Sequence, residues 1–172
     1  MVADASTLAK ASKLSQGYTL RDATHADITA LVNHRRRMFE DMDARRGRRY
    51  GAADLDAMDA VYAGQLQAQL ADGSLRAWVI ETSGQIVASG AVLFRQWLPR
   101  PNDLTQRLAY LHSVYTVPEH RRRGLARRIV ETAIEACRAQ GLRRLVLHAS
   151  EQGQPLYQSL GFLPTNEMRL AL

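Results

Sequence analysis

The chain has 172 residues, 46% of them hydrophobic, and its 23 basic and 17 acidic side chains give a formal net charge of +6. This is enough for one domain with one buried core, and the single cysteine, Cys137, excludes an internal disulfide framework and a cysteine-rich zinc site. No apolar run reaches the roughly 20 residues of a membrane span, and the N-terminus lacks the apolar core of a signal peptide, so we expect a soluble cytoplasmic protein.

Residues 1–17 are small and polar and predict a mobile N-terminal tail, followed by a single domain over residues 18–172. A short strand is expected at 18–23, after which Thr24 and Asp27 resemble a capping box that opens a helix. Apolar residues then recur at helical spacing up to Met42, before a basic loop at 44–52. A second helix is predicted from about Asp54 to Leu70.

Two apolar runs follow at 76–82 and 85–97, and the Ser83-Gly84 pair between them predicts a β-hairpin. Another strand is predicted at 107–117, where Pro118 ends it. A third helix beginning near Arg123 precedes a strand at 143–149, a short helix at 153–161 and a last strand at 162–172. The order βααβββαβαβ indicates a mixed α/β domain with at least one parallel strand pair.

Three consecutive arginines and Gly124 stand directly before the third helix. A helix N-terminus carries unpaired N–H groups and a partial positive charge, so it readily binds phosphate. Gly124 would let an anion approach the backbone closely. The spacing matches neither the P-loop nor the dinucleotide fingerprint, so these residues by themselves leave a phosphate site and a solvated basic turn equally open.

Residues 114–126, VYTVPEHRRRGLA, resemble motif A of the GNAT superfamily of acyl-CoA-dependent N-acyltransferases, with Arg121, Gly124 and Ala126 at the motif positions. Residues 147–162, LHASEQGQPLYQSLGF, resemble motif B of the same family. The resemblance covers residues 18–172. It implies a mixed, mostly antiparallel central sheet with flanking helices, in which the fourth and fifth strands splay apart.

The resemblance also implies the acyl donor, acetyl-CoA, and no metal. Backbone N–H groups of the segment from Arg122 to Arg127 would bind its pyrophosphate, and the strand residues before Pro118 would pair with the pantetheine arm and stabilise the oxyanion. The cofactor-binding residues implied in this way are Val114, Tyr115, Thr116, Arg122, Arg123, Gly124, Leu125, Ala126, Arg127 and Ser150. Ser150 stands where many family members have an asparagine.

By resemblance, Tyr157 is the general acid that protonates the departing thiolate; the residue type alone would favour a packed tyrosine whose hydroxyl is bonded to backbone. His112 is the candidate base, against the alternative of a hydrogen-bonded strand histidine. Leu145 stands where some peptide acetyltransferases carry a base glutamate. His148 and Glu81 are reserve candidates that we expect to be structural, and Cys137 is expected in the core.

The predicted function is transfer of an acetyl group from acetyl-CoA to a primary amine of a small molecule or peptide, by direct attack in a ternary complex. The arginine-rich segment 34–52 is either a site for an acceptor with a carboxylate or phosphate, or a solvated helix face and loop. As a further alternative, Glu40 or Asp41 could hold an ammonium group. The basic clusters at 35–49 and 121–128 leave nucleic-acid binding as an alternative, disfavoured by the few aromatic residues among them. A non-catalytic acyl-CoA-binding protein and a homodimer also stay open.

Overall fold

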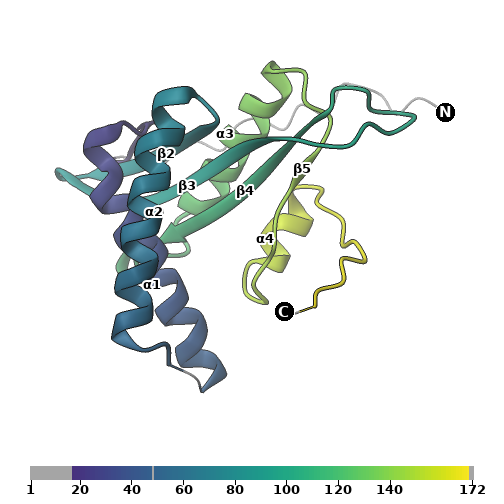
Figure 1. The fold of residues 1–172 in the computed structure, drawn as a ribbon. Helices are drawn as coiled ribbons and strands as arrows, with labels where there is room; N and C mark the ends of the chain where they lie inside the picture. The colour runs from purple at the N-terminus through teal and green to yellow at the C-terminus, as the bar shows by residue number, and fades with distance from the viewer. Residues whose placement is uncertain (1–16, 48, 171–172) are drawn as a thin grey trace.

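A five-stranded sheet with helices on both faces forms the body of the molecule in the computed structural model, which describes residues 17–47 and 49–170 (Figure 1). The predicted mobile tail, apart from Gly17, lies outside the described residues. In chain order the elements are β1 (Thr19–Asp22), η1 (His25–Asp27), α1 (Ile28–Arg46), α2 (Ala52–Asp72), β2 (Leu75–Thr82), β3 (Gln85–Gln96), β4 (Arg107–Thr116), η2 (Pro118–His120), α3 (Leu125–Ala139), β5 (Leu145–Val146) and α4 (Gln154–Ser159).

The strands lie in the order β1-β2-β3-β4-β5, with the first three pairings antiparallel and the last one parallel. This confirms the predicted mixed, mostly antiparallel sheet. β5 pairs with β4 only at two positions, Ala109 with Leu145 and Tyr110 with Val146. Within the described residues, β4 therefore has no strand partner on that side from residue 111 to 116, which confirms the predicted splay of the fourth and fifth strands.

Two local predictions at turns are confirmed. Ser83 and Gly84 form the two-residue turn between β2 and β3, with φ angles of 49° and 74°. Positive φ at both central positions is what a tight hairpin with right-handed strand twist requires. At the entry to η1, the backbone N–H of Thr24 donates to Asp27 Oδ2 at 2.7 Å, which is the backbone half of the expected capping box.

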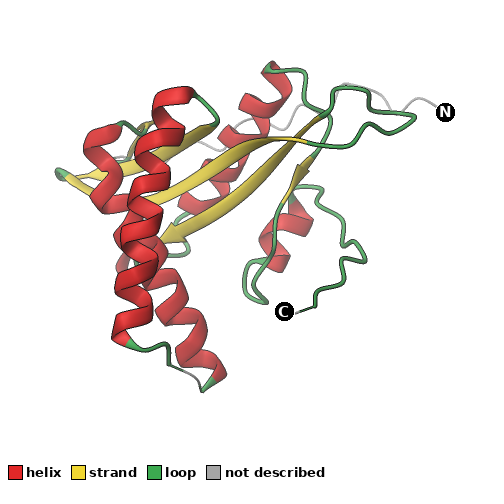
Figure 2. Ribbon diagram, viewed as in Figure 1, coloured by secondary structure: helices red, strands yellow, loops and turns green. Residues whose placement is uncertain are grey.

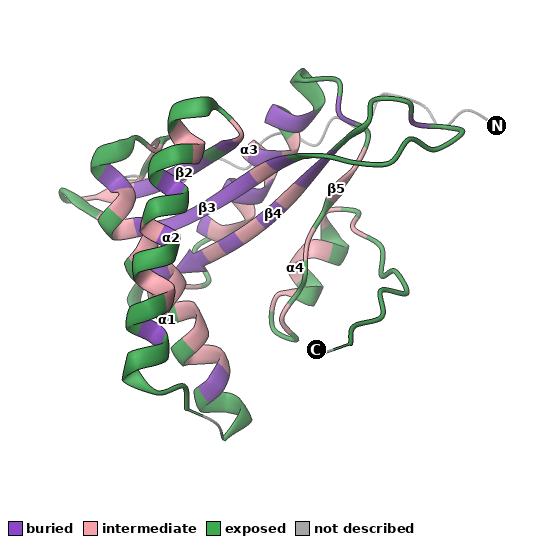
Figure 3. Ribbon diagram, viewed as in Figure 1, coloured by how far each residue is buried: buried purple, intermediate pink, exposed green. Residues whose placement is uncertain are grey.

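Apolar side chains form a separate cluster on each face of the sheet, as the alternation of strand side chains requires. Figure 3 shows buried positions along the central strands and on the helices that flank them. On one face α3 contributes buried residues such as Ile129 and Ala133, which pack on Trp78 and Ile80 of β2. On the other face α1 and α2 cover β2 and β3. Cys137 is buried in the α3 layer, as expected, and burial raises the pKa of its thiol to about 11.

The predicted last strand is wrong for residues 162–170, which are loop in the structure (Figure 2). Pro164 has no N–H to give to a strand ladder. β5 is only two residues long, so it offers little edge for a further strand. The apolar side chains that a strand would bury stay in solvent, since Leu163, Met168 and Leu170 are each more than four-fifths exposed.

Candidate active site

A β-bulge in the middle of β4 sets the direction of the side chains on this strand. The pairing with β3 slips between Ser89 and Ala91, so two β4 residues, Ser113 and Val114, lie opposite one β3 residue. Ser113 has φ of +54°, which is uncommon for a residue with a side chain. Because of the extra residue, His112 and Ser113 both face the layer of α1 and α2 instead of opposite faces.

Beyond the bulge, within the described residues, the open side of β4 carries backbone N–H groups that pair with no neighbouring strand. Val117 donates its N–H to the carbonyl oxygen of Val87, on the β3 side. N–H groups point alternately to the two sides of a strand, so those of Val114 and Thr116 point away from β3. Of the three predicted strand residues, Tyr115 is the one whose N–H points toward β3, where it pairs with Ser89.

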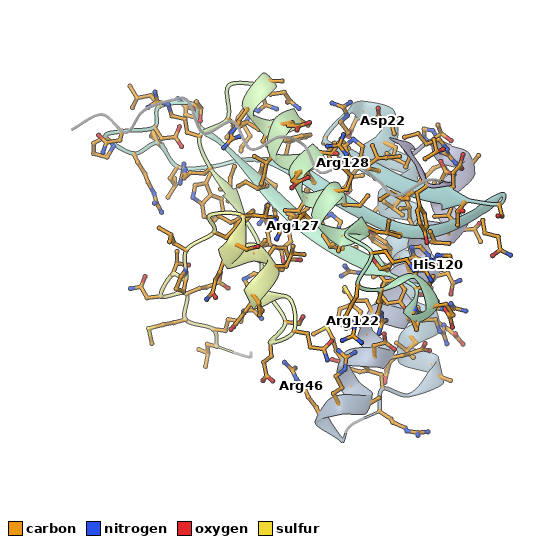
Figure 4. The ribbon with its side chains drawn as sticks, turned by 180° about the vertical axis from the view of Figure 1, so that it is seen from behind. Asp22, Arg46, His120, Arg122, Arg127 and Arg128 are labelled. Carbon is orange, nitrogen blue, oxygen red and sulfur yellow. The ribbon has the colours of Figure 1, made fainter. Side chains whose placement is uncertain are left out.

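The open side of β4 leads directly into the N-terminus of α3. Gly124 is the residue before α3 and has φ of +78°, and Arg122 in the same loop has φ of +59°. A Cβ atom placed on Gly124 would meet nothing within 4 Å, so the space before the first turn of the helix is open. Figure 4 shows Arg122, Arg127 and Arg128 around this helix end.

Several arginine side chains of this segment bind the protein itself. Arg123 donates to the hydroxyl of Tyr18 at 3.0 Å, and Arg127 donates to Ser159 Oγ of α4 at 2.7 Å. Leu125 is buried and Ala126 half-buried in the first turn of α3. The groups left to receive an anion here are mainly backbone N–H groups and the exposed Arg122.

Arg121 joins this loop to β4 and to α1. Its Nε–H donates to the carbonyl oxygen of Thr116 at 2.9 Å, and its Nη2 donates to Asp41 Oδ2 in an ion pair. The guanidinium also lies over the ring of Tyr115, 5.5 Å from its centroid. Arg121, the basic residue of the segment that resembles motif A, therefore connects β4 and α1.

Ser150 has a local structural role. Its Oγ accepts the N–H of Gly153 at 3.2 Å, and its carbonyl oxygen accepts N–H groups of Gly153 and Gln154. These bonds hold the turn that begins α4. A contact of Ser150 with the cofactor stays a prediction.

Tyr157 lies on α4 with its ring against the α3-side core and against Phe162, whose ring centroid is 5.7 Å away. Gly153 makes room for this ring, because a Cβ on Gly153 would come within 2.8 Å of Tyr157 Cε2. Among the described residues the hydroxyl has no hydrogen-bond partner. Burial raises the pKa of Tyr157 to about 12, so the phenol keeps its proton at neutral pH.

His112 belongs to a polar cluster centred on the hydroxyl of Ser113. Arg35 of α1 donates to Ser113 Oγ at 2.9 Å, Tyr62 Oη of α2 lies 3.4 Å from the same atom, and His112 Nδ1 lies 3.0 Å from it. Burial, together with the positive charges of Arg35 and Arg95, lowers the pKa of His112 to about 4. The imidazole is therefore neutral, and able to accept a proton, throughout the neutral pH range.

A second chain of polar groups near His112 was missed by the sequence analysis. The ring of Tyr110 stacks on that of His112 at 5.9 Å, and its hydroxyl lies 2.7 Å from His148 Nδ1. His148 Nε2 lies 2.7 Å from a carboxylate oxygen of Glu167. The two-residue spacing of Tyr110 and His112 indicates a shared strand face, but Glu167 falls in the segment wrongly assigned to a strand.

The other reserve candidate, Glu81, pairs with Arg21 of β1 at 3.1 Å, as expected for a structural residue. Within residues 17–47 and 49–170, no three histidine, cysteine, aspartate or glutamate side chains are grouped as a metal site requires. No helix in the same ranges is long and apolar enough to cross a membrane.

Comparison with known proteins gives matches to acetyltransferases in sequence and in structure. The chain is 38% identical to N-acetyltransferase family 8 member 3 of Rattus norvegicus over 94 residues, which are 52% of this chain and 39% of the rat protein. It therefore spans less than half the length of that relative.

Two solved structures match nearly the whole fold. A GCN5-related N-acetyltransferase from Ralstonia eutropha JMP134 superposes with a TM-score of 0.82 at 32% identity, over 91% of this chain and 99% of the other. A predicted acetyltransferase from Clostridium acetobutylicum, whose structure was determined with acetyl-CoA, gives a TM-score of 0.80 at 26% identity, over 90% and 96% of the two chains.

The sequence model of the acetyltransferase (GNAT) family matches residues 30–162, which include β4, the loop before α3, and α4. This match contains both segments in which the resemblance was first seen, and it spans well over half of the sequence. The chain therefore belongs to the acetyltransferase (GNAT) family.

Proposed function

We propose that the protein transfers the acetyl group of acetyl-CoA directly to a primary amine of a small molecule or peptide. The observation that carries the proposal is the unpaired side of β4, which runs from residue 111 to the N-terminus of α3. A polar arm can pair with such an open strand while an anionic group at its end binds the helix terminus. The acetyl-CoA in the related clostridial structure supports this donor.

The pyrophosphate would be held by backbone N–H groups of residues 122–127, and the N–H of Val114 would stabilise the oxyanion formed when the amine nitrogen attacks the thioester carbon. His112 accepts the proton that the amine loses. The carbon–sulfur bond then breaks, and the Tyr157 hydroxyl gives its proton to the departing thiolate. Its hydroxyl has no hydrogen-bond partner among the described residues, and its raised pKa keeps it protonated at neutral pH.

His112 can act as the base in one tautomer. The Ser113 hydroxyl accepts the Arg35 N–H, so it can accept one further proton and donate its own. In the structure the Tyr62 hydroxyl donates to Ser113 Oγ at 3.4 Å, and rotation of the two hydroxyl groups can reverse this direction. If His112 Nδ1–H donates to Ser113 Oγ, the reversed bond lets Ser113 donate to Tyr62, and the lone pair on His112 Nε2 is free.

The test of the proposal is a thiol-release assay with acetyl-CoA against polyamines, arylalkylamines, amino acids, aminoglycosides and short peptides, combined with titration of CoA binding. We expect CoA to bind and at least one amine class to release thiol above the hydrolysis background. Absence of both would refute the proposal. CoA binding without thiol release from any amine would favour the alternative of a non-catalytic acyl-CoA-binding protein.

Replacing His112 by alanine tests the base. We expect kcat/KM for the amine at pH 7 to fall by about a hundredfold, the lower end of the usual effect of a general base. Protonation inactivates a base, so a limb due to His112 lies near pH 4 in the wild-type pH–rate profile and is absent in the variant.

Tyr110→Phe is the matched comparison, because it keeps the stacked ring and removes only the hydroxyl that meets His148. We expect a change in kcat/KM of less than about threefold, the small effect typical of losing a hydrogen bond outside the reaction path. A larger loss in Tyr110→Phe than in His112→Ala would mean that the proton leaves through Tyr110, His148 and Glu167, and that His112 is not the base.

A further inference from the structure

Arg35 of α1 is a half-buried cation beside the polar cluster of Ser113 and His112. Its guanidinium lies between two aromatic rings, 5.1 Å from the centroid of Phe39 and 4.7 Å from that of Tyr62. One N–H binds Ser113 Oγ. A guanidinium has five N–H donors, so several remain for another partner. The two aromatic rings and the bond to Ser113 position the Arg35 guanidinium beside the bulge of β4.

Arg35 also lacks a counter-ion. Within residues 17–47 and 49–170, no carboxylate lies within ion-pair distance of its guanidinium, whereas the next residue, Arg36, pairs with three carboxylates. The acidic residues of α1 that could have served it are engaged elsewhere, Glu40 with Arg36 and Asp41 with Arg121. A partly desolvated cation without an anion is costly, so the fold leaves a favourable place for an anionic group.

A second unpaired arginine approaches the same place from β3. Arg95 lies over the rings of Trp97 and Tyr110, at 5.8 Å and 5.4 Å, and has no carboxylate partner in the described part of the chain. The positive charges of Arg35 and Arg95 both lower the pKa of His112. A cationic amine would be repelled from this position, and an anionic group would be attracted.

We propose that the acceptor is a primary amine that also carries an anionic group, a carboxylate or a phosphate, and that Arg35 binds this group with Arg95 beside it. The proposal rests on the acetyltransferase function above and narrows its acceptor. Arginine suits the role because its planar fork binds either anion through paired N–H bonds. The same positive field favours the uncharged form of the attacking amine. Polycationic amines are excluded as preferred acceptors.

Matched amine pairs test the proposal on the wild-type protein. L-Phenylalanine is compared with 2-phenylethylamine, γ-aminobutyrate with n-butylamine, and O-phosphoethanolamine with ethanolamine, with spermidine as the polycation. We expect one anionic member to exceed its neutral partner by about tenfold or more in kcat/KM, the size of one charge-assisted contact. The carboxylate and phosphate pairs identify which anion is used. Equal or better rates with the neutral amines or spermidine would refute the proposal.

Two arginine variants test whether Arg35 is the residue that binds the anionic group of the acceptor. Arg35→Gln should lower kcat/KM for the preferred anionic amine by roughly tenfold to a hundredfold more than for its neutral partner, because losing the contact with Ser113 and the effect on His112 acts on both amines alike. The control is Arg138→Gln, which removes one positive charge at an exposed position in the last turn of α3. It should change kcat/KM for neither amine. An equal loss for both amines in Arg35→Gln would mean a structural role and would overturn the assignment.

A binding measurement separates this proposal from the function on which it rests. The anionic amines are titrated into CoA-saturated wild-type and Arg35→Gln proteins by calorimetry. Binding that is weakened in Arg35→Gln supports the anion site even if no amine releases thiol, in which case the transferase proposal fails alone. Thiol release from neutral amines, without anion binding, refutes the anion site and leaves the transferase proposal intact. Absence of both refutes both.

Discussion

Replacing Tyr157 by phenylalanine is expected to lower kcat by about two to three orders of magnitude while leaving the KM for acetyl-CoA close to the wild-type value. The range is typical of losing a general acid. The substitution removes only a hydroxyl that has no hydrogen-bond partner among the described residues. The ring and its contact with Phe162 remain, so the fold should keep its stability. Steady-state kinetics of the wild type and Tyr157→Phe measure kcat and KM, and thermal melts of the two proteins compare their stability.

A merely packed tyrosine would behave differently from a proton donor. If the hydroxyl only fills space, Tyr157→Phe keeps full activity, and the assignment of the general acid is wrong. An acyl donor with a better leaving thiol needs less help from a general acid. The loss of kcat in Tyr157→Phe should therefore be smaller with an aryl acetyl thioester than with acetyl-CoA. Tyr50→Phe, at an exposed tyrosine of the α1–α2 loop, is the control and should leave kcat unchanged.

Replacing Gly124 by alanine is expected to weaken the binding of CoA by roughly tenfold to a hundredfold. The residue has φ of +78°, where a side chain costs about 1–2 kcal/mol. The added Cβ would meet no protein atom within 4 Å, so any effect on affinity beyond this strain reports a ligand in front of the helix end. Calorimetric titration with CoA measures the affinity, and a thermal melt measures the strain.

Gly141 provides a matched control just after the C-terminal end of the same helix. It has φ of +69°, and a Cβ there would also meet nothing within 4 Å. Gly141→Ala should therefore lose similar stability and bind CoA as tightly as the wild type. If Gly124→Ala and Gly141→Ala bind CoA equally well, the helix N-terminus is not the pyrophosphate site.

Much of the local structure could be predicted because short-range rules determine it. The hairpin at Ser83 and Gly84 and the start of η1 at Thr24 depend on residues within four positions of each other. The buried face of α3 follows from helical periodicity alone, and it includes Cys137 as expected. The prediction of a last strand was wrong because it depends on a distant part of the fold. The apolar residues of this segment are compatible with a strand, but a strand forms only where the edge of a neighbouring strand is available.

The side chains of the site depended on contacts between distant segments. The bulge at Ser113 rests on the register of β4 against β3, and no local pattern in the sequence predicts such a slip. The contact of Arg35 with Ser113 joins residues 78 positions apart, and that of Tyr110 with His148 joins residues 38 positions apart. Ser150 was predicted from the family pattern as a cofactor contact, and the structure adds its bond to Gly153.

The sequence by itself determined the family, the helix end at Gly124 and the segment that carries Tyr157, because motifs and periodicity are properties of neighbouring residues. Only the tertiary structure decided that β4 has an open side, that His112 and Ser113 share a face, and that Arg35 has no counter-ion among residues 17–47 and 49–170. These features depend on strand register and on which charges meet across the fold. The sequence leaves both undetermined until the sheet and its two helical layers pack together.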